Sequence, residues 1–366
     1  MSNPIAKRNI AISLPMTGED EWHAVREPLM SGWLTQGPKV AAFEKAFAER
    51  HQVKHALAVT SCTTGLHLAL AGLGIGPGDE VIVPSFTFAA TANSVALTGA
   101  TPVFADIDPL TYCLDPKSVE AAITERTAAI MPVHLYGHPA DVTALGALAQ
   151  AHGLQLFEDA AQAHGASWQG APVGSFGTFG MFSLYPTKNM TSGEGGMVSC
   201  ATPEVVRQVQ LLRNQGMEKR YENEVVGFNS RMTDVHAAIG RVQLGKLPAW
   251  TQQRQENAAF LSANLQGVGV PHVAEGATHV WHQYTIRVPQ DRDGFAKALL
   301  DEHGVGSGVY YPIPNHQLPS FALDFDLPVT REACEQVLSL PVHPSLSQGD
   351  LERIVAGVNA VAKAGA

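Results

Sequence analysis

Short apolar runs alternate with segments of helical periodicity over most of the first 250 residues of the chain. The predicted strands are residues 56–60, 80–84, 101–106, 128–133, 154–157, 179–184 and 196–200. The helices predicted around them are residues 40–50, 66–73, 117–123, 141–152 and 203–215. Strands that alternate with helices in this way form βαβ units. The pattern therefore predicts an α/β fold with a mostly parallel central sheet.

Pro248 follows the helical pattern of residues 235–247 and is predicted to end that helix and the large domain. Beyond it, further helical and strand-like segments are residues 254–265, 282–288, 294–302, 308–311, 331–338 and 351–363. A chain of 366 residues also exceeds the size at which single cores stop growing. We predict a large domain of residues 1–248 and a smaller α/β domain of residues 249–366. Residues up to about 38 form an extension of the first, and residues 31–38 an ordered loop.

The charge balance disfavours two classes of partner. The formal net charge is -10 and the pI is about 5.8, and no clustered basic face is visible in the sequence. Binding to nucleic acid or to a membrane surface normally needs such a face, so neither is expected. No apolar run is long enough to span a bilayer, and Met1 to Asn9 lack the apolar core of a signal peptide.

The four cysteines, at positions 62, 113, 200 and 334, are far apart and form no C-x-x-C pair. This spacing argues against a zinc site and against a disulfide framework. We therefore expect no metal, and a protein of the reducing cytoplasm.

The first candidate for chemistry is Lys188, which lies in a loop of small and polar residues between the predicted strands 179–184 and 196–200. Most lysines are solvated surface charges. A lysine packed among glycines and apolar strands instead loses hydration, which lowers its pKa and makes its amine a nucleophile.

Two further segments suggest ligand contacts. Residues 61–65 form a small polar turn between a strand and a helix, whose first N–H groups and hydroxyls can hold a phosphate or simply cap the helix. Asp159 and Gln162 follow the strand 154–157, at the end of the sheet where ligands bind in open α/β folds. The acidic residue could equally be a helix cap.

Pyridoxal 5'-phosphate (PLP) accounts for all three features. Its aldehyde condenses with a lysine, its phosphate suits a helix N-terminus, and its pyridine nitrogen must stay protonated. Asp159 fits the last role because an adjacent negative charge raises the pKa of that nitrogen. Phe88 would cover the ring, and Ser183 would add a hydroxyl for the phosphate.

Over nearly its whole length the chain resembles the DegT/DnrJ/EryC1/StrS family of PLP-dependent sugar aminotransferases, and five ordered motifs carry this resemblance. The motifs are residues 60–70, 79–91, 158–165, 183–196 and 227–232. The resemblance implies the aspartate aminotransferase fold (fold type I), with a large α/β/α domain and a smaller C-terminal α/β domain. It also implies a homodimer with active sites at the subunit interface.

The resemblance assigns a role to each matching residue. Lys188 would form the Schiff base (internal aldimine) and shuttle the proton, and Asn229 would reach the phosphate bound by the neighbouring subunit. The other cofactor contacts that it implies are Cys62, Thr63, Phe88, Asp159, Gln162 and Ser183. Cys62 departs from the glycine, asparagine or alanine more familiar at that position, but a backbone donor tolerates this change.

The implied reaction is a ping-pong transamination from an amino acid, usually glutamate, to a nucleotide-linked keto sugar. Segments that resemble substrate-facing parts of the family contain Trp33, Thr35, Arg231, Tyr311 and His316. Residues 310–316 resemble members that aminate deoxysugars. Three alternatives stay open: a sugar dehydratase, a cyclitol aminotransferase, and a non-catalytic sensor of sugar nucleotides. The dehydratases of the family carry histidine in place of the lysine. The nucleotide, the carbon aminated and the product stereochemistry are not set by the sequence.

Overall fold

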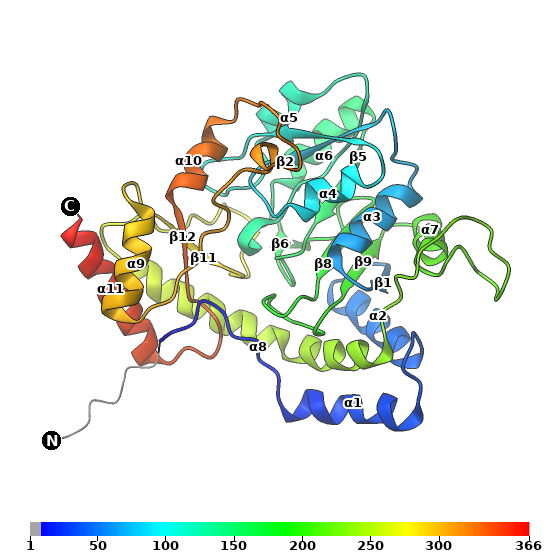
Figure 1. Ribbon diagram of the computed structural model, residues 1–366, viewed down its shortest axis with the longest axis horizontal. Coiled ribbons are helices and arrows are strands. Elements are labelled where there is room, and N and C mark those ends of the chain that lie inside the picture. Colours follow the sequence, from blue (N-terminus) through cyan, green and yellow to red (C-terminus); the bar gives the residue numbers. More distant parts are fainter. Residues whose placement is uncertain (1–8, 366) are drawn as a thin grey trace.

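The computed structural model describes residues 9–365 and is built around a seven-stranded sheet (Figure 1). Across the sheet the strands are β1 (His55–Val59), β9 (Gly196–Cys200), β8 (Phe179–Ser183), β5 (Gln155–Asp159), β4 (Thr127–Ile130), β2 (Glu80–Pro84) and β3 (Thr101–Ala105). All neighbours run parallel except β9, which is antiparallel to both β1 and β8. The prediction of a mostly parallel central sheet is confirmed.

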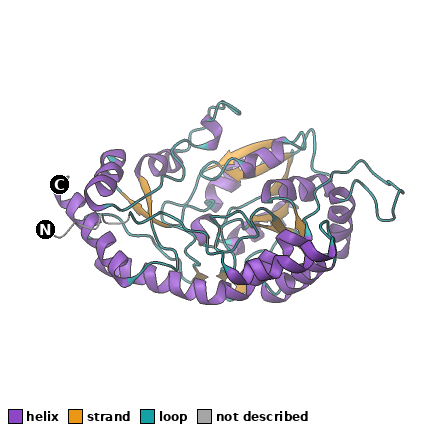
Figure 2. Cartoon of the chain, turned by 60° about the horizontal axis from the view of Figure 1, so that its bottom comes forward, coloured by secondary structure: helices purple, strands orange, loops and turns teal. Residues whose placement is uncertain are grey.

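Helices cover both faces of this sheet (Figure 2). They are α2 (Pro38–Arg50), α3 (Cys62–Gly72), α4 (Ala90–Ala96), α5 (Pro116–Ala122), α6 (Val142–His152) and α7 (Pro203–Arg213). Successive strand residues point to opposite faces, so Val81 and Val83 pack in one core and Ile82 packs in another. Because both faces are buried, the strands are continuous apolar runs. This is the α/β/α layering that the sequence predicts.

A second group of elements packs beside the large sheet and contains the antiparallel pair β11 (Tyr284–Arg287) and β12 (Val337–Leu340). Its helices are α9 (Arg292–His303) and α11 (Gln348–Ala364), whereas Ala333 and Cys334 of α10 (Pro328–Gln336) pack in a core of the large sheet. Tyr284, Leu299 and Ile354 belong to the core of this second group, which Ile10 from the start of the chain also enters. The predicted strand at 308–311 is reduced to one bridge, between Gly308 and Ser339.

The prediction that Pro248 ends a helix is wrong. Helix α8 (Asp234–Asn264) is 31 residues long, contains Pro248 in its interior and extends along the lower side of the molecule in Figure 1, from one half to the other. A proline inside a helix removes one hydrogen bond and costs about 3 kcal/mol. Here apolar residues on both sides of Pro248 offset that cost: Leu244 and Leu247 pack in the core of one half, and Ala258 and Leu261 in that of the other. The division into domains near residue 248 stays a prediction.

Helix α1 (Glu19–Ser31) was not predicted; it contains a proline in its interior, and only Glu21 and Pro28 are buried. It packs on α8, where Glu21 accepts hydrogen bonds from Gln243 and Lys246, each 2.8 Å long. Short elements complete the chain: β6 (Ser167–Trp168), β7 (Ala171–Pro172), β10 (Ala277–Thr278) and the 3-10 turns Leu135–Gly137 and Asn315–Gln317.

No helix within residues 9–365 is long and apolar enough to cross a membrane. The segment Met1 to Asn9 is expected to contain no signal peptide. Residues 1–8 of it lie outside the described residues.

Asp234 links the first residue of α8 to the N-terminus of α2. Its buried carboxylate accepts hydrogen bonds from the backbone N–H groups of Gly37 (2.8 Å), Lys39 (3.1 Å) and Val40 (3.0 Å). We expect Asp234→Ala to lower the free energy of unfolding by about 2 kcal/mol, because it leaves these donors unpaired. Denaturant unfolding of both proteins measures this. Asp234→Asn, which keeps one acceptor oxygen, should lose less, and equal losses would contradict the capping role.

Candidate active site

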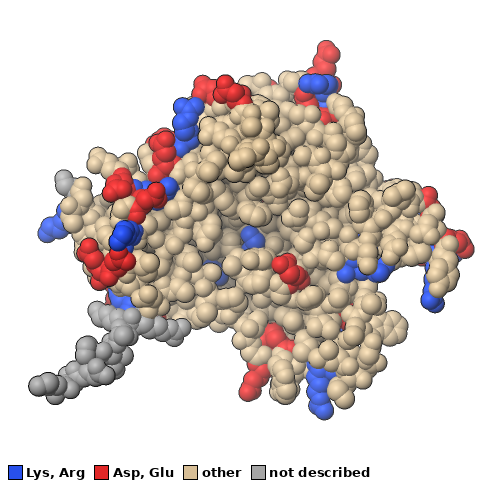
Figure 3. All heavy atoms as spheres, viewed as in Figure 1, with Lys and Arg blue, Asp and Glu red and all other residues tan. Residues whose placement is uncertain are grey.

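A cavity of about 620 Å³ opens at the carboxyl ends of the parallel strands. Figure 3 shows it as a hollow near the centre of the molecule, with most charged side chains at the edges of this face. Asp159 is the last residue of β5, Ser183 is the last residue of β8, and Ser61 follows β1 closely. The sheet topology therefore brings these separated segments to one place. The predicted site residues that line the cavity are Cys62, Thr63, Phe88, Asp159, Gln162, Ser183, Lys188 and Tyr311.

The loop that carries Lys188 is held by hydrogen bonds at both ends. Leu184 N–H donates to Gly195 O at 3.0 Å, and Ser192 N–H donates to Leu184 O at 3.1 Å. Gly193 and Gly195 adopt φ values of +87° and +147°, which disfavour a side chain. The Lys188 backbone itself bonds to the carbonyl of Tyr185 at 3.0 Å. Lys188 is thus fixed in the cavity, as the sequence suggests for a lysine with a special role.

Burial lowers the pKa of the Lys188 amine below that of an ordinary lysine, while the nearby Cys62 and Asp159 act in the opposite direction. Lowering occurs because a charged ammonium loses hydration when it is buried. A larger share of Lys188 is therefore neutral at a given pH, and only the neutral amine is a nucleophile.

Opposite Lys188, the N-terminus of α3 faces the cavity with Cys62 and Thr63 in its first turn. Ser61 caps this helix, with its hydroxyl oxygen accepting from Thr64 N–H at 3.1 Å. The first-turn N–H groups have no partner within the helix. Gly196 of β9 packs directly against them, since a Cβ there would lie 2.9 Å from the nitrogen of Cys62. Ser61 therefore caps the helix while Cys62 and Thr63 still face the cavity, so this turn can hold an anion.

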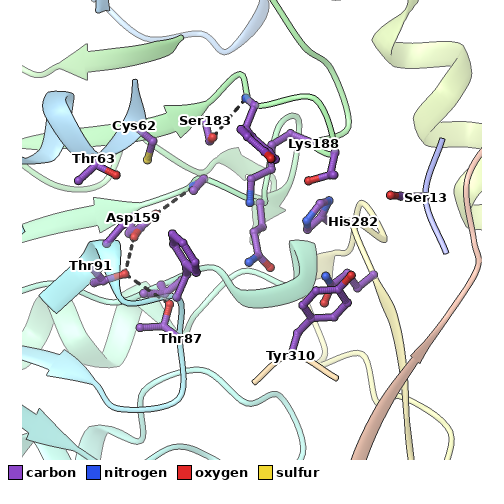
Figure 4. Close-up of a pocket in the computed structure, with 18 of the residues that line it drawn as sticks. Ser13, Cys62, Thr63, Thr87, Thr91, Asp159, Ser183, Lys188, His282 and Tyr310 are labelled. Atoms are coloured by element: carbon purple, nitrogen blue, oxygen red, sulfur yellow. Dashed lines mark hydrogen bonds between the residues drawn. The ribbon is translucent and has the colours of Figure 1, made fainter. Parts of the chain in front are cut away.

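Asp159 lies on the same side of the cavity as Cys62 and Thr63 (Figure 4). Its carboxylate accepts hydrogen bonds from the Thr91 hydroxyl at 2.8 Å and from Ala161 N–H at 3.1 Å. Burial raises the pKa of Asp159, and these two donors act against the rise. No ion pair joins Asp159 to a basic side chain within residues 9–365. It is therefore a buried carboxylate, held in one orientation and able to accept a cationic partner.

Gln162 and Tyr311 form a second polar group in the cavity. The Gln162 side-chain oxygen accepts from Tyr136 N–H at 2.7 Å, and its amide donates to the Tyr311 hydroxyl at 3.2 Å. Phe88 has its ring centroid 6.1 Å from that of Tyr311 and is 60% exposed. An aromatic residue with this exposure beside a cavity is free to cover a flat ligand.

The remaining predicted site residues lie outside the cavity lining. Asn229 is exposed in the segment that follows α7, and Arg231 donates to Asn214 Oδ1 at 2.7 Å. Trp33 and Thr35 are exposed near the start of α2. His316 is buried, with its Nδ1 2.7 Å from the Ser85 hydroxyl. Within one chain the structure does not bring these residues together with Lys188, so their contacts to cofactor or substrate stay predictions.

Several residues that line the cavity were not singled out from the sequence: Ser13, Thr91, Glu194, Arg254, His282 and His343. Figure 4 shows His282 and Ser13 on the side of the cavity away from Asp159. Thr91 is the last residue of the motif 79–91, so the sequence did contain a signal that could have identified it as a site residue. Arg254 and His282 come from parts of the chain without a local motif, and no sequence signal connects them to Lys188.

Comparisons with known proteins agree with this geometry. A model of the DegT/DnrJ/EryC1/StrS aminotransferase family matches residues 15–359. The chain is 45% identical over 323 residues to the UDP-N-acetyl-3-dehydro-alpha-D-glucosamine 3-aminotransferase of Acidithiobacillus ferrooxidans, covering 87% of this chain and 87% of that one.

Two solved structures have nearly the same fold. DesV of S. venezuelae is 42% identical, with a TM-score of 0.91 over 94% of this chain and 95% of that one. Spr1654 of Streptococcus pneumoniae, solved in its PLP form, is 30% identical, with a TM-score of 0.91 over 97% of this chain and 99% of that one. The chain belongs to the DegT/DnrJ/EryC1/StrS aminotransferase family.

Proposed function

We propose that this protein is a PLP-dependent aminotransferase that moves an amino group from an amino acid, glutamate in the first instance, to a nucleotide-linked keto sugar. The observation that carries the proposal is that one cavity is lined by Lys188, by the buried carboxylate of Asp159 and by the N-terminus of α3. Each supplies a different requirement of PLP, and they come from three separate parts of the chain.

The residues of the cavity fit this cofactor. The first-turn N–H groups of α3 and the Ser183 hydroxyl would hold the phosphate, and Gly196 keeps the approach to that helix free of a side chain. Asp159 lacks a basic partner and would hold the protonated ring nitrogen. Phe88 and Gln162 would contact the ring. When bound, PLP supplies an aldehyde that condenses with amines and a ring that accepts electrons.

Lys188 would move the proton in this chemistry. As a neutral amine, its Nζ would take a proton from the carbon that bears the amino group of the donor, and as an ammonium it would give that proton to a second carbon, the one that receives the amino group. The lowered pKa favours the first of these states, and the fixed loop keeps Nζ in the cavity. Thr91 positions Asp159 through its hydrogen bond.

The names of relatives support a sugar nucleotide as acceptor. The Acidithiobacillus ferrooxidans relative is a 3-aminotransferase of a UDP-linked keto sugar, and it shares nearly half of its residues with this chain. This similarity does not identify the nucleotide of the acceptor or the sugar carbon that receives the amino group in this protein. Retention of Lys188, rather than histidine, is the feature that favours an aminotransferase over a dehydratase.

A homodimer is part of the proposal. Large apolar side chains are exposed in α1, in the loop before α2 and in the segment 214–229, which projects from the body in Figures 1 and 2. They are Trp22, Leu29, Met30, Trp33, Leu34, Tyr221, Val226 and Phe228. A second copy that covers them would remove this surface from water and would bring Asn229 to a neighbouring active site. The four cysteines are all unpaired, which fits a cytoplasmic enzyme.

A single-turnover reaction with glutamate tests the proposal. We expect the holoenzyme to convert glutamate to 2-oxoglutarate and PLP to pyridoxamine phosphate in equal amounts, without any sugar present. Absorbance of the cofactor and chromatography of the products measure this. A panel of keto sugar nucleotides then restores the starting spectrum only with the true acceptor. If no amino acid yields pyridoxamine phosphate, the sensor and dehydratase alternatives gain and the aminotransferase proposal fails.

A further inference from the structure

Arg254 is a buried arginine in the middle of α8 that lines the same cavity as Lys188. It is 7% exposed. Its Nη1 donates to the carbonyl oxygens of Trp281, at 3.0 Å, and His282, at 3.5 Å. These two bonds fix the plane of the guanidinium group against the segment that carries the His282 side chain into the cavity.

The charge of Arg254 has no counter-charge. No ion pair joins it to an acidic residue in the described chain, and its Nε is buried without a hydrogen-bond partner. The other deeply buried arginine, Arg213, bonds instead to the carboxylate of Glu44 at 2.6 Å and to the carbonyl of Ala58 at 2.7 Å. Burial without compensation lowers the pKa of Arg254 to about 10. A buried charge is costly unless it is paired, so a bound anion would complete this site.

The donors that Arg254 leaves unused suit a carboxylate. Nη1 is occupied by two carbonyls, and no hydrogen bond within residues 9–365 uses Nε or Nη2. Nε and Nη2 form one edge of the guanidinium plane, and that edge binds the two oxygens of a carboxylate side by side. A diphosphate is bulkier and carries at least two charges, which a single buried guanidinium does not balance.

We propose that Arg254 binds a carboxylate of the amino-acid donor, an inference that rests on the proposed function. The basic side chains of Lys and Arg that line the cavity, among the described residues, are Lys188 and Arg254. Lys188 has to act on the amino end of the donor and must lose its charge to do so. The carboxylate then needs a second cation in the same cavity, and Arg254 is that cation. His282 also lines the cavity, and burial and both basic residues lower its pKa, so it does not supply that cation.

Calorimetric titration of the holoenzyme with glutarate, a dicarboxylate without an amino group, measures this site independently of turnover. We expect Arg254→Gln to raise the Kd of glutarate by about a hundredfold or more, because it removes two paired hydrogen bonds and each hydrogen bond to a charged group contributes about 1.5–3 kcal/mol. Arg254→Lys keeps the charge but loses the paired donors, so its Kd for glutarate should lie between those of the wild type and Arg254→Gln. Arg241→Gln, the same change at an exposed position of the same helix, is the matched control.

The half-reactions identify the anion. The KM for glutamate should rise with the Kd of glutarate, and the KM for the keto sugar nucleotide should change far less. A larger effect on the sugar nucleotide would overturn the proposal in favour of a phosphate site, and unchanged glutarate binding would leave Arg254 a purely structural residue. If the wild type binds glutarate but transfers no amino group, the proposed function fails on its own.

Thermal unfolding of each variant checks that it is folded. Should both Arg254 variants fail to fold, a crystal of the wild-type holoenzyme soaked with glutarate decides the matter. Density for a carboxylate on Nε and Nη2 of Arg254 supports the assignment. Density for glutarate elsewhere in the cavity overturns it.

Discussion

Lys188→Ala is expected to lower the turnover of transamination by at least about 10³-fold, because one amine serves both as nucleophile and as general acid and base. The change removes Nζ from the cavity but leaves the N-terminus of α3, the proposed phosphate site, and the carboxylate of Asp159 in place. The variant should therefore still bind PLP without a covalent bond. Steady-state rates, together with the absorbance of the bound cofactor and its loss on dialysis, measure both effects.

Lys188→Arg is the matched control for charge, since a guanidinium stays protonated and is a poor nucleophile. We expect it to be as inactive as Lys188→Ala. Rates above about a hundredth of the wild type in either variant would contradict the assignment of Lys188. A small primary amine added to Lys188→Ala should recover part of the rate, because it supplies a base where Nζ was. The same amine should not change the activity of the wild type.

The sequence predicts those parts of the site in which one short segment contains both a strand or helix end and the polar side chain that lines the cavity. The turn 61–65 does lie between a strand and a helix and lines the cavity, although α3 begins at Cys62 rather than at residue 66, and its role as an anion site stays a prediction. Asp159 was placed beyond a strand and is in fact its last residue. Such errors of a few residues do not change where a side chain lies, because the sheet topology fixes which strand ends meet.

Other parts depend on contacts between segments far apart in the chain. Arg254 takes its place from carbonyls 27 and 28 residues further on, and nothing near it in the sequence indicates a cavity. Pro248 was expected to end a helix, and packing against two cores overrides that local preference. His316 is buried 2.7 Å from the Ser85 hydroxyl and does not line the cavity, a placement that its own segment does not indicate, and its contact to substrate stays a prediction. Tertiary contacts of this kind leave no periodic signal.

Asp159→Asn is expected to lower the rates of both half-reactions by about 10²–10³-fold, the range found when one fixed electrostatic contact is removed from an active site. The substitution keeps the size of the side chain and one of the two oxygens, which accept separately from Thr91 and Ala161, but it removes the negative charge. Without that charge, the pyridine nitrogen has a lower pKa and the ring becomes a weaker acceptor of electrons. Single-turnover rates with glutamate and with the sugar measure the effect.

Thr91→Val separates the charge of Asp159 from its orientation. Valine has nearly the same shape as threonine but donates no hydrogen bond, so Asp159 keeps its charge and loses the 2.8 Å contact that positions it. We expect a loss of about tenfold, close to one hydrogen bond to a charged group and well below that of Asp159→Asn. The carboxylate should also become easier to protonate, because the Thr91 hydroxyl acts to lower its pKa. The acid limb of the pH–rate profile should therefore move to higher pH in Thr91→Val. An unchanged limb, with a rate loss as large as that of Asp159→Asn, would mean that Thr91 contacts the reacting groups itself.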